Sequence, residues 1–549
     1  MQTPAFVATK TVGTWKLLRG LIFVAAGIAA CLSPALAYGQ TQVDGATSGN
    51  WSNASSWNPA VVPNNGGGNT YDVTLLNSPA VTITLDISPT IDTLTLDAGS
   101  TLQSDTSIAG TTLTTSSVSD DGKIQLSNGN TLTVNGAMTV GTTGYFDLDR
   151  ASTLVVNGSL SNSGQFFTNA QSLNAGPNTV TVTGTFTNNA GATARIGFVS
   201  TTANVMNVAT LVNNGSLYIN SGATLNLTNQ PNGVTDVAQG SALTVYGALN
   251  AGTANGFAKL GSVEGALVIG TGQTFTDTPG SGTLTTSSGS SVDLEFGTKM
   301  TVAGNLTNAG QLDVGLNQAG FANRLTVTGT FTNSASGVVF IGAFSSNPDL
   351  DVMNVGTLVN NGTLEIQPGA TLNLTNQPNG ITDIASGSEI ILDGSLTAGT
   401  ANAFAKLNSI EGNLVIQNGQ AFTDKPGSGT LTITGGGLGL SSGSLTVSGN
   451  LTNSGGLGTD ETLTVTGTFT NNGLTQIGFG AQATAPGGYG RPTNQQRYVD
   501  LVWHAEFDKS AKRNHRHSCK HNAAAFREVQ CRGEQCIGEA RQRGRNSRD

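Results

Sequence analysis

Hydrophobic and polar residues alternate along short stretches through most of this chain. In TLNLT (residues 371–375) and TLTVT (residues 462–466), every Leu or Val stands between Thr or Asn residues. Because successive side chains of an extended strand point to opposite faces, the pattern puts apolar residues on one face and uncharged polar residues on the other. Gly and Asn between the stretches suit tight corners, which need left-handed backbone. The pattern predicts many short strands and no long helix.

The chain also contains a long internal duplication. The stretch GATLNLTNQPNG at residues 222–233 returns unchanged at residues 369–380, an offset of 147 residues. The same offset relates TANGFAKL to TANAFAKL and FTDTPGSGTLT to FTDKPGSGTLT. A 147-residue unit therefore occurs twice, over about 181–327 and 328–474.

A shorter motif recurs inside this unit. It consists of Gly, a small polar residue, Leu or Phe, one further residue and Asn, and a short strand-like stretch follows it. The six motifs begin at Gly158, Gly184, Gly304, Gly329, Gly449 and Gly467. In stacked coils, their Asn side chains would form ladders along a corner.

Two all-β architectures accommodate this alternation. An antiparallel β-sandwich would divide the chain into several domains of about 100 residues. A parallel β-solenoid instead buries one face of every coil inside a tube and stacks like residues from coil to coil. The density of repeats and the lack of linkers favour the solenoid. In that fold Leu225, Leu227, Leu372 and Leu374 point into the core, and Asn373 faces water.

The first 37 residues have the features of an export signal. Three cations precede the apolar stretch at residues 21–32, and small residues follow, so cleavage is expected before Tyr38. A membrane-spanning helix is the alternative, but twelve apolar residues fall short of the ~20 that a bilayer needs. In a second alternative, residues 28–31 form a lipobox and Cys31 is lipidated. A capping β-region at 38–110 and the solenoid at 111–481 are expected to follow.

Residues 44–102 carry a family resemblance. Trp51 and Trp57, the turn VVPNNG, the strand YDVT and the stretch LDISPTIDTLTLDAGSTL resemble the opening of bacterial exported surface proteins. The resemblance is to those of the autotransporter-like and PEP-C-terminal sorting (exosortase-substrate) kinds. It implies right-handed β-helices with adhesive or extracellular-matrix roles. The two tryptophans have two interpretations: they stack on sugar rings, or they cap the open end of the solenoid.

Charge narrows the range of partners. Residues 38–481 hold eight cations and 26 acidic residues, a net charge near −18, which disfavours nucleic acid. The expected partners are cell-surface or extracellular glycans, or further copies of the chain. Membrane contact is expected only through an anchor that this sequence does not contain. The expected location is outside the cell or at the bacterial cell surface.

Catalytic chemistry has few candidates in the repeats. Residues 38–481 contain neither His nor Cys, so triads, thiol nucleophiles and zinc sites are excluded there. No calcium-binding motif occurs, and no cofactor is expected. Two pairs of carboxylates remain, Asp147 with Asp149 and Asp293 with Glu295. We therefore expect a non-enzymatic adhesive or structural protein, with a polysaccharide-degrading β-helix lyase or hydrolase as the alternative.

The tail at 482–549 differs abruptly from the repeats. It contains 13 of the 24 cations, and the alternation of Thr with Leu or Val vanishes. A zinc or nucleic-acid module would use His504, His515, His517, Cys519, His521, Cys531 and Cys536. Their spacing fits no standard zinc pattern. The third copy of the repeat also ends at a point where the two earlier copies continue, which favours a frameshifted, disordered tail.

Overall fold

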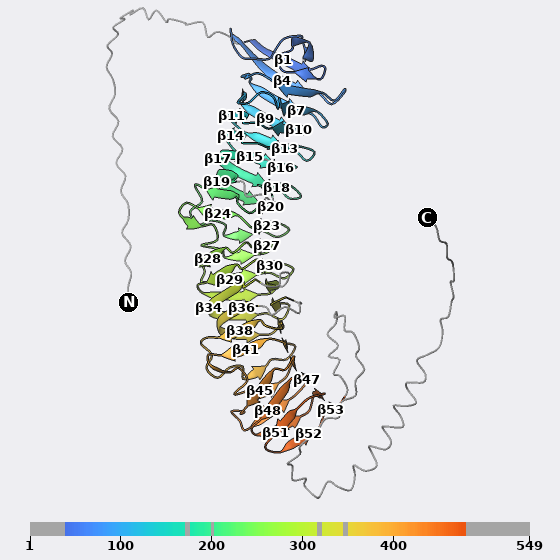
Figure 1. The fold of residues 1–549 in the computed structure, drawn as a ribbon, viewed down its shortest axis with the longest axis vertical. Helices are drawn as coiled ribbons and strands as arrows, with labels where there is room; N and C mark the ends of the chain where they lie inside the picture. The colour runs from blue at the N-terminus through green and yellow to red at the C-terminus, as the bar shows by residue number, and fades with distance from the viewer. Residues whose placement is uncertain (1–38, 171–175, 199–202, 316–320, 344–349, 479–549) are drawn as a thin grey trace, which may run out of the picture.

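A computed structural model describes residues 39–478 except 171–175, 199–202, 316–320 and 344–349. The predictions for the signal segment at 1–37, for Cys31 and for the tail at 482–549 lie outside these residues. The described chain forms an elongated rod of stacked β-coils (Figure 1). Its coils pair in parallel, and this confirms the predicted all-β parallel solenoid.

Three strand-bearing faces surround the core, and face 1 is a continuous ladder. Each of its strands pairs in parallel with the next one of the ladder. The strands of face 1 are β2 (Gly49–Asn50), β5 (Thr82–Leu85), β7 (Thr101–Ser104), β10 (Lys123–Leu126), β13 (Tyr145–Leu148), β16 (Gln165–Thr168), β18 (Thr193–Ile196), β20 (Ser216–Ile219), β23 (Ala242–Val245), β27 (Ala266–Ile269), β30 (Ser291–Leu294), β33 (Gln311–Val314), β35 (Val338–Ile341), β37 (Thr363–Ile366), β40 (Glu389–Leu392), β44 (Asn413–Gln417), β47 (Gly437–Ser441), β50 (Gly456–Thr459) and β53 (Leu474–Ile477).

Face 2 is divided into three shorter ladders. Its first ladder contains β8 (Thr112–Thr115), β11 (Thr131–Val134), β14 (Thr153–Val156), β17 (Thr179–Asn188), β19 (Val205–Asn213), β21 (Thr224–Leu227) and β24 (Ala248–Ala251). Its second contains β28 (Thr274–Asp277), β31 (Lys299–Val302), β34 (Arg324–Asn333), β36 (Val352–Asn360), β38 (Thr371–Leu374) and β41 (Ser395–Ala398). Its third contains β45 (Ala421–Asp424), β48 (Ser444–Val447) and β51 (Leu463–Val465).

Face 3 is interrupted at two places. Before the first break it contains β4 (Asn69–Leu75), β6 (Thr93–Leu96), β9 (Ser117–Asp120), β12 (Met138–Val140), β15 (Leu160–Asn162) and the second halves of β17 and β19. Between the breaks it contains β22 (Asp236–Val237), β26 (Ser262–Val263), β29 (Thr283–Thr286), β32 (Asn305–Asn308) and the second halves of β34 and β36. After the second break it contains β39 (Asp383–Ile384), β43 (Ser409–Ile410), β46 (Thr430–Ile433), β49 (Asn450–Asn453) and β52 (Phe469–Asn471).

A few short elements decorate the coils. The strand β1 (Gly39–Gly45) extends face 3 in parallel with β4, and β3 (Trp57–Asn58) pairs antiparallel with β1. Two matching hairpins add β25 (Ala254–Asn255) to β24 and β42 (Ala401–Asn402) to β41. A short 3-10 helix, η1 (Ala54–Ser56), lies near the N-terminal end of the rod.

The core lies inside the tube, where the inward residues of neighbouring coils stack. Phe146 and Phe166 stack with nearly parallel rings, 5.1 Å between centroids, and both are fully buried. The four leucines assigned to the core by alternation are 0–1 % exposed: Leu225, Leu227, Leu372 and Leu374. Asn373, between two of them, is only half-buried and bonds to Asn354 on the neighbouring coil. The inward and outward assignment is therefore confirmed.

Candidate functional site

The outer side of face 1 carries an aromatic strip, which we define as Lys123, Tyr145, Phe167, Arg195 and Tyr218. These residues come from five successive strands, β10, β13, β16, β18 and β20. Phe167, Arg195 and Tyr218 occupy directly paired register positions, and Lys123 pairs with Tyr145. Each side chain is half-buried, so part of its surface meets solvent.

Cations and aromatic rings contact one another along the strip. The Lys123 ammonium lies 5.3 Å from the Tyr145 ring centroid, and that ring meets Phe167 edge-on at 5.5 Å. The Arg195 guanidinium lies 5.6 Å from the Phe167 centroid and 5.7 Å from that of Tyr218. Such cation–π contacts contribute about 0.5–1 kcal/mol each at exposed sites. Together with the Tyr145–Phe167 ring contact, they join the five side chains into one surface.

A hollow adjoins one end of the strip. It is lined by Ser100 and Thr101 from one coil, Lys123 from the next, and Thr143 and Tyr145 from the third. The Lys123 ammonium, the Tyr145 phenol and the hydroxyls of Thr101 and Thr143 therefore converge beside the aromatic rings, whereas Ser100 is fully buried. This set can accept and donate hydrogen bonds to a polyhydroxylated ligand.

The first predicted carboxylate pair lies under this surface. Asp147 occupies an outward position of β13, yet its side chain is fully buried, and its Oδ1 accepts a hydrogen bond from the Ala170 backbone N–H at 3.1 Å. Asp149 lies just beyond the strand and is 7 % exposed. Burial, together with the neighbouring Asp149 carboxylate, raises the pKa of Asp147 to about 6. A polysaccharide chain cannot reach a fully buried carboxylate without a change of structure.

Raised carboxyl pKa values are not special to this pair. Burial raises the pKa of Asp120 to about 8, and it raises those of Asp277 and Asp424 to about 7. These three lie on faces 3 and 2, distributed along the rod. Raised carboxyl pKa values often mark catalytic acids. Because several carboxyl groups along this rod have raised pKa values, the raised pKa of Asp147 does not by itself identify a catalytic residue.

The second predicted pair has a different arrangement. Asp293 lies on β30, and its direct register partner in the next coil is Asp313 on β33. Burial raises the pKa of Asp313 to about 6. Glu295 lies beyond the end of β30 and accepts a 2.8 Å hydrogen bond from the Tyr246 hydroxyl. The sequence pattern did not identify Asp313 as a partner of Asp293. Residues that face each other across coils are separated by irregular distances along the chain.

The two tryptophans lie in the interior of the N-terminal end. Trp51 and Trp57 are 0 % and 2 % exposed, and their rings meet at 66° with centroids 4.9 Å apart. The Trp51 indole N–H donates to the Pro63 carbonyl at 3.0 Å, and that of Trp57 donates to the Trp51 carbonyl at 2.9 Å. Neither ring presents a free face to a sugar.

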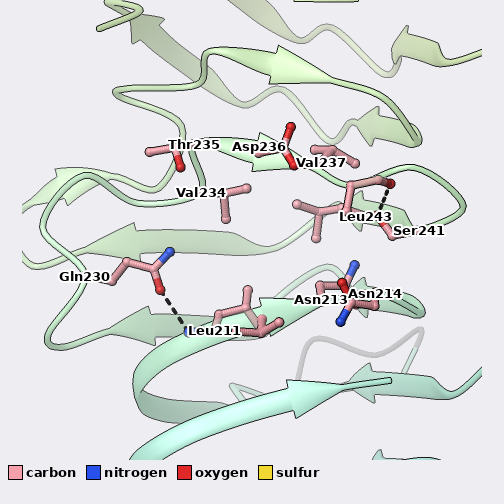
Figure 2. Close-up of a pocket in the computed structure, with 12 residues that line it drawn as sticks. Leu211, Asn213, Asn214, Gln230, Val234, Thr235, Asp236, Val237, Ser241 and Leu243 are labelled. Carbon is pink, nitrogen blue, oxygen red and sulfur yellow. Dashed lines mark hydrogen bonds between the residues drawn. The ribbon is translucent and has the colours of Figure 1, made fainter. Parts of the chain in front are cut away.

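A second concave site lies on face 3, in the first break between β19 and β22 (Figure 2). This groove has a volume of about 210 Å³. Its lower wall contains Leu211, Val212 and Asn213, and its upper wall contains Asp236 and Val237. Unlike the strip, the groove has no aromatic side chain in its lining.

Comparisons with family models, curated proteins and solved structures found no match to this chain. Among the residues that the structure describes, no three His, Cys, Asp or Glu side chains gather in a way that could hold a metal ion. The same residues include no helix with the length and apolar character needed to cross a membrane.

Proposed function

We propose that this chain is a secreted or cell-surface adhesive β-solenoid that holds extracellular glycans on its aromatic strip. The observation that carries the proposal is the strip itself, where rings and cations from five successive coils form one partly exposed surface. Aromatic rings offer flat apolar surface together with a polar edge, which suits the faces and hydroxyls of sugar rings. A parallel solenoid provides a rigid support for such a surface.

The two cations of the strip favour an acidic glycan over a neutral one, because they form a local positive surface on an otherwise acidic rod. Residues 38–481 contain eight cations, and two of them, Lys123 and Arg195, belong to the strip. The planar guanidinium of Arg195 can bind a carboxylate or sulfate through two parallel hydrogen bonds. Asp147 and Asp149, which follow Tyr145 closely in the chain, are buried, so they do not project toward a bound polymer.

The test is binding of the full chain to immobilised acidic and neutral glycans. Replacing Phe167, Arg195 and Tyr218 together by Ala should reduce binding to acidic glycans at least tenfold. Ile391→Ala, at an outward position of the same face on β40, serves as the matched control and should bind normally. Equal binding by the triple variant and the parent chain would refute the proposal.

The same glycans test the enzymatic alternative. Bond cleavage by the full chain, lost in Asp147→Asn or Asp149→Asn, would replace an adhesive function with a carbohydrate-degrading one. Cleavage that survives both substitutions would require other groups. We expect retention of the intact polymer without new chain ends.

A further inference from the structure

The two breaks in face 3 have the same construction. The first separates β19 from β22, and the second separates β36 from β39, 147 residues further along the chain. At both breaks a Gln side chain bonds across the gap: Gln230 Oε1 accepts from the Leu211 N–H and Gln377 Oε1 from the Leu358 N–H, each at 2.8 Å. The same local arrangement thus occurs at both breaks.

The exposed lining repeats as well. Val212 is 43 % exposed in the first break, and its counterpart Val359 is 41 % exposed in the second. Both exceed the few per cent typical of the apolar side chains in the solenoid core. An open strand edge beside a groove offers unpaired backbone groups to which another strand can add.

The lower wall of the first groove has an open backbone edge. Successive residues of a parallel strand bond alternately to its two neighbours. The Asn214 N–H bonds to the Asn188 carbonyl of the preceding coil at 2.8 Å, so Leu211 and Asn213 face the following coil. The Gln230 side chain accepts the Leu211 N–H, whereas no strand among the described residues pairs with Asn213 on that side.

The upper wall offers a facing edge. The Gly261 and Glu264 N–H groups donate to the Thr235 and Val237 carbonyls, each at 2.8 Å, so these two residues bond to the next coil, β26. Asp236 lies between them and directs its backbone groups to the opposite side, toward the groove. Two strand edges therefore face one another without pairing.

From these edges we propose that the groove at the first break, and the matching break between β36 and β39, each bind an extended peptide segment of a partner protein by strand addition. Backbone N–H and C=O groups of a peptide are complementary to the open edges of β19 and β22, whereas a sugar would find no aromatic ring to stack on. The groove contains one carboxylate, Asp236, and no cation, so it favours a neutral or lysine-bearing peptide. This site is separate from the aromatic strip.

The repeat makes the chain bivalent. The strand β20 follows β19 at the first break, and β37 follows β36 at the second. Along face 1, β37 is six strands further than β20. At ~4.8 Å for each strand the two breaks lie about 29 Å apart along the rod. A partner with two such segments would gain avidity from binding both.

Calorimetry with the full chain tests the site, using the capped peptide Lys-Thr-Val-Thr-Val-Thr-Lys as the probe. We expect two peptides for each chain. Val212→Arg and Val359→Arg should each leave one site, and the double variant none. Thr285→Arg, at an exposed position of the same face on β29, is the matched control and should retain two. Because the Val residues are already solvent-exposed, the variants should keep the parent melting temperature.

A proline version of the peptide tests the proposed mode of binding. Replacing its central Thr by Pro removes a backbone donor and should weaken binding at least tenfold. Hydrogen exchange of the Asn213 and Asp236 amides should slow when the original peptide binds. Equal binding of both peptides, or stoichiometry unchanged in the double variant, would overturn the proposal. Binding of a neutral oligosaccharide in place of the peptide, lost in the double variant, would assign the grooves to glycans instead.

Discussion

The side-chain amides of Asn188 and Asn213 are joined across neighbouring coils, with Nδ2 of the first 2.8 Å from Oδ1 of the second. Asn162 bonds to Asn188 in the same way at 2.8 Å, which extends the ladder by one coil. A second ladder joins Asn308, Asn333 and Asn360, at 3.0 Å and 2.8 Å. The recurrent Asn of the six-fold motif therefore stacks along one corner, as its repetition predicts.

Removing the side-chain amide of the middle Asn in the second ladder should lower the free energy of unfolding. Asn333 is fully buried, donates to Asn360 and accepts from Asn308. Asn333→Ala leaves polar groups of both neighbours without this partner, and we expect a loss of about 2 kcal/mol in the free energy of unfolding. Chemical denaturation would measure it. Asn250→Ala, which removes an outward amide bond to Asn226, is the control and should cost less than about 1 kcal/mol.

The inward and outward faces of β38 should respond differently to substitution. Leu374 is 1 % exposed, so Leu374→Asp would place an unpaired charge in an apolar stack and cost about 3 kcal/mol or more. Asn373 is half-buried on the outer surface, where it bonds to Asn354 at 2.9 Å. Asn373→Ser should cost less than about 1 kcal/mol. Similar melting temperatures for the two variants would contradict the assignment.

The free energy of unfolding should fall as the pH rises from about 4 to about 8. Burial raises the pKa of Asp120 to about 8 and those of Asp277 and Asp424 to about 7, from an ordinary value of 3.8. In this interval the folded protein therefore holds protons that the unfolded chain releases, and each released proton favours unfolding. Urea denaturation at pH 5 and pH 8 should show the higher free energy of unfolding at pH 5.

A single substitution provides the control for this pH dependence. Asp120→Asn removes the most strongly shifted carboxyl group from the titration, so the difference between pH 5 and pH 8 should become smaller. A parent chain that gains stability between pH 5 and pH 8 would show that other groups dominate.

The N-terminal end of the rod should loosen when Trp51 is truncated. Its ring is fully buried, packs on Trp57 and donates to the Pro63 carbonyl. Trp51→Ala should cost about 3–5 kcal/mol, and faster hydrogen exchange should concentrate in the first coils because each coil depends on its neighbours. Glycan binding by the aromatic strip, which begins on β10, should persist. Loss of glycan binding with unchanged exchange would instead indicate a sugar site at Trp51.

Alternation and duplication were sufficient to predict the architecture, because both are local and repeated. The position of Leu374 in the core follows from the two-residue alternation of a strand. The stacking of Asn188 on Asn213 follows from the recurrence of Asn at the same corner of successive coils. The breaks in face 3 could not be predicted in this way. At each break a Gln side chain from the intervening loop bonds to the strand edge, and this contact between coils is not encoded in the alternation.

The candidate sites were harder to predict than the fold. Phe167, Arg195 and Tyr218 are adjacent in space but are separated by 28 and 23 residues in the sequence, so no period brings them together. Asp147 and Asp149 attracted attention because they are close in sequence, yet they are largely withdrawn from solvent. An alignment of coils by strand register, rather than by residue number, would have found the strip.

The ladder of face 1 has a mechanical consequence. Its inter-coil hydrogen bonds run along the length of the rod, and the strands that they join lie across it (Figure 1). A tensile load between the two ends would therefore open one row of bonds at a time, at the outermost coil, rather than shear many rows together. Each detached coil of about 20–25 residues would release several nanometres of extended chain, since a residue spans ~3.4 Å. Under tension the molecule would lengthen stepwise and dissipate work while the remaining coils stay folded.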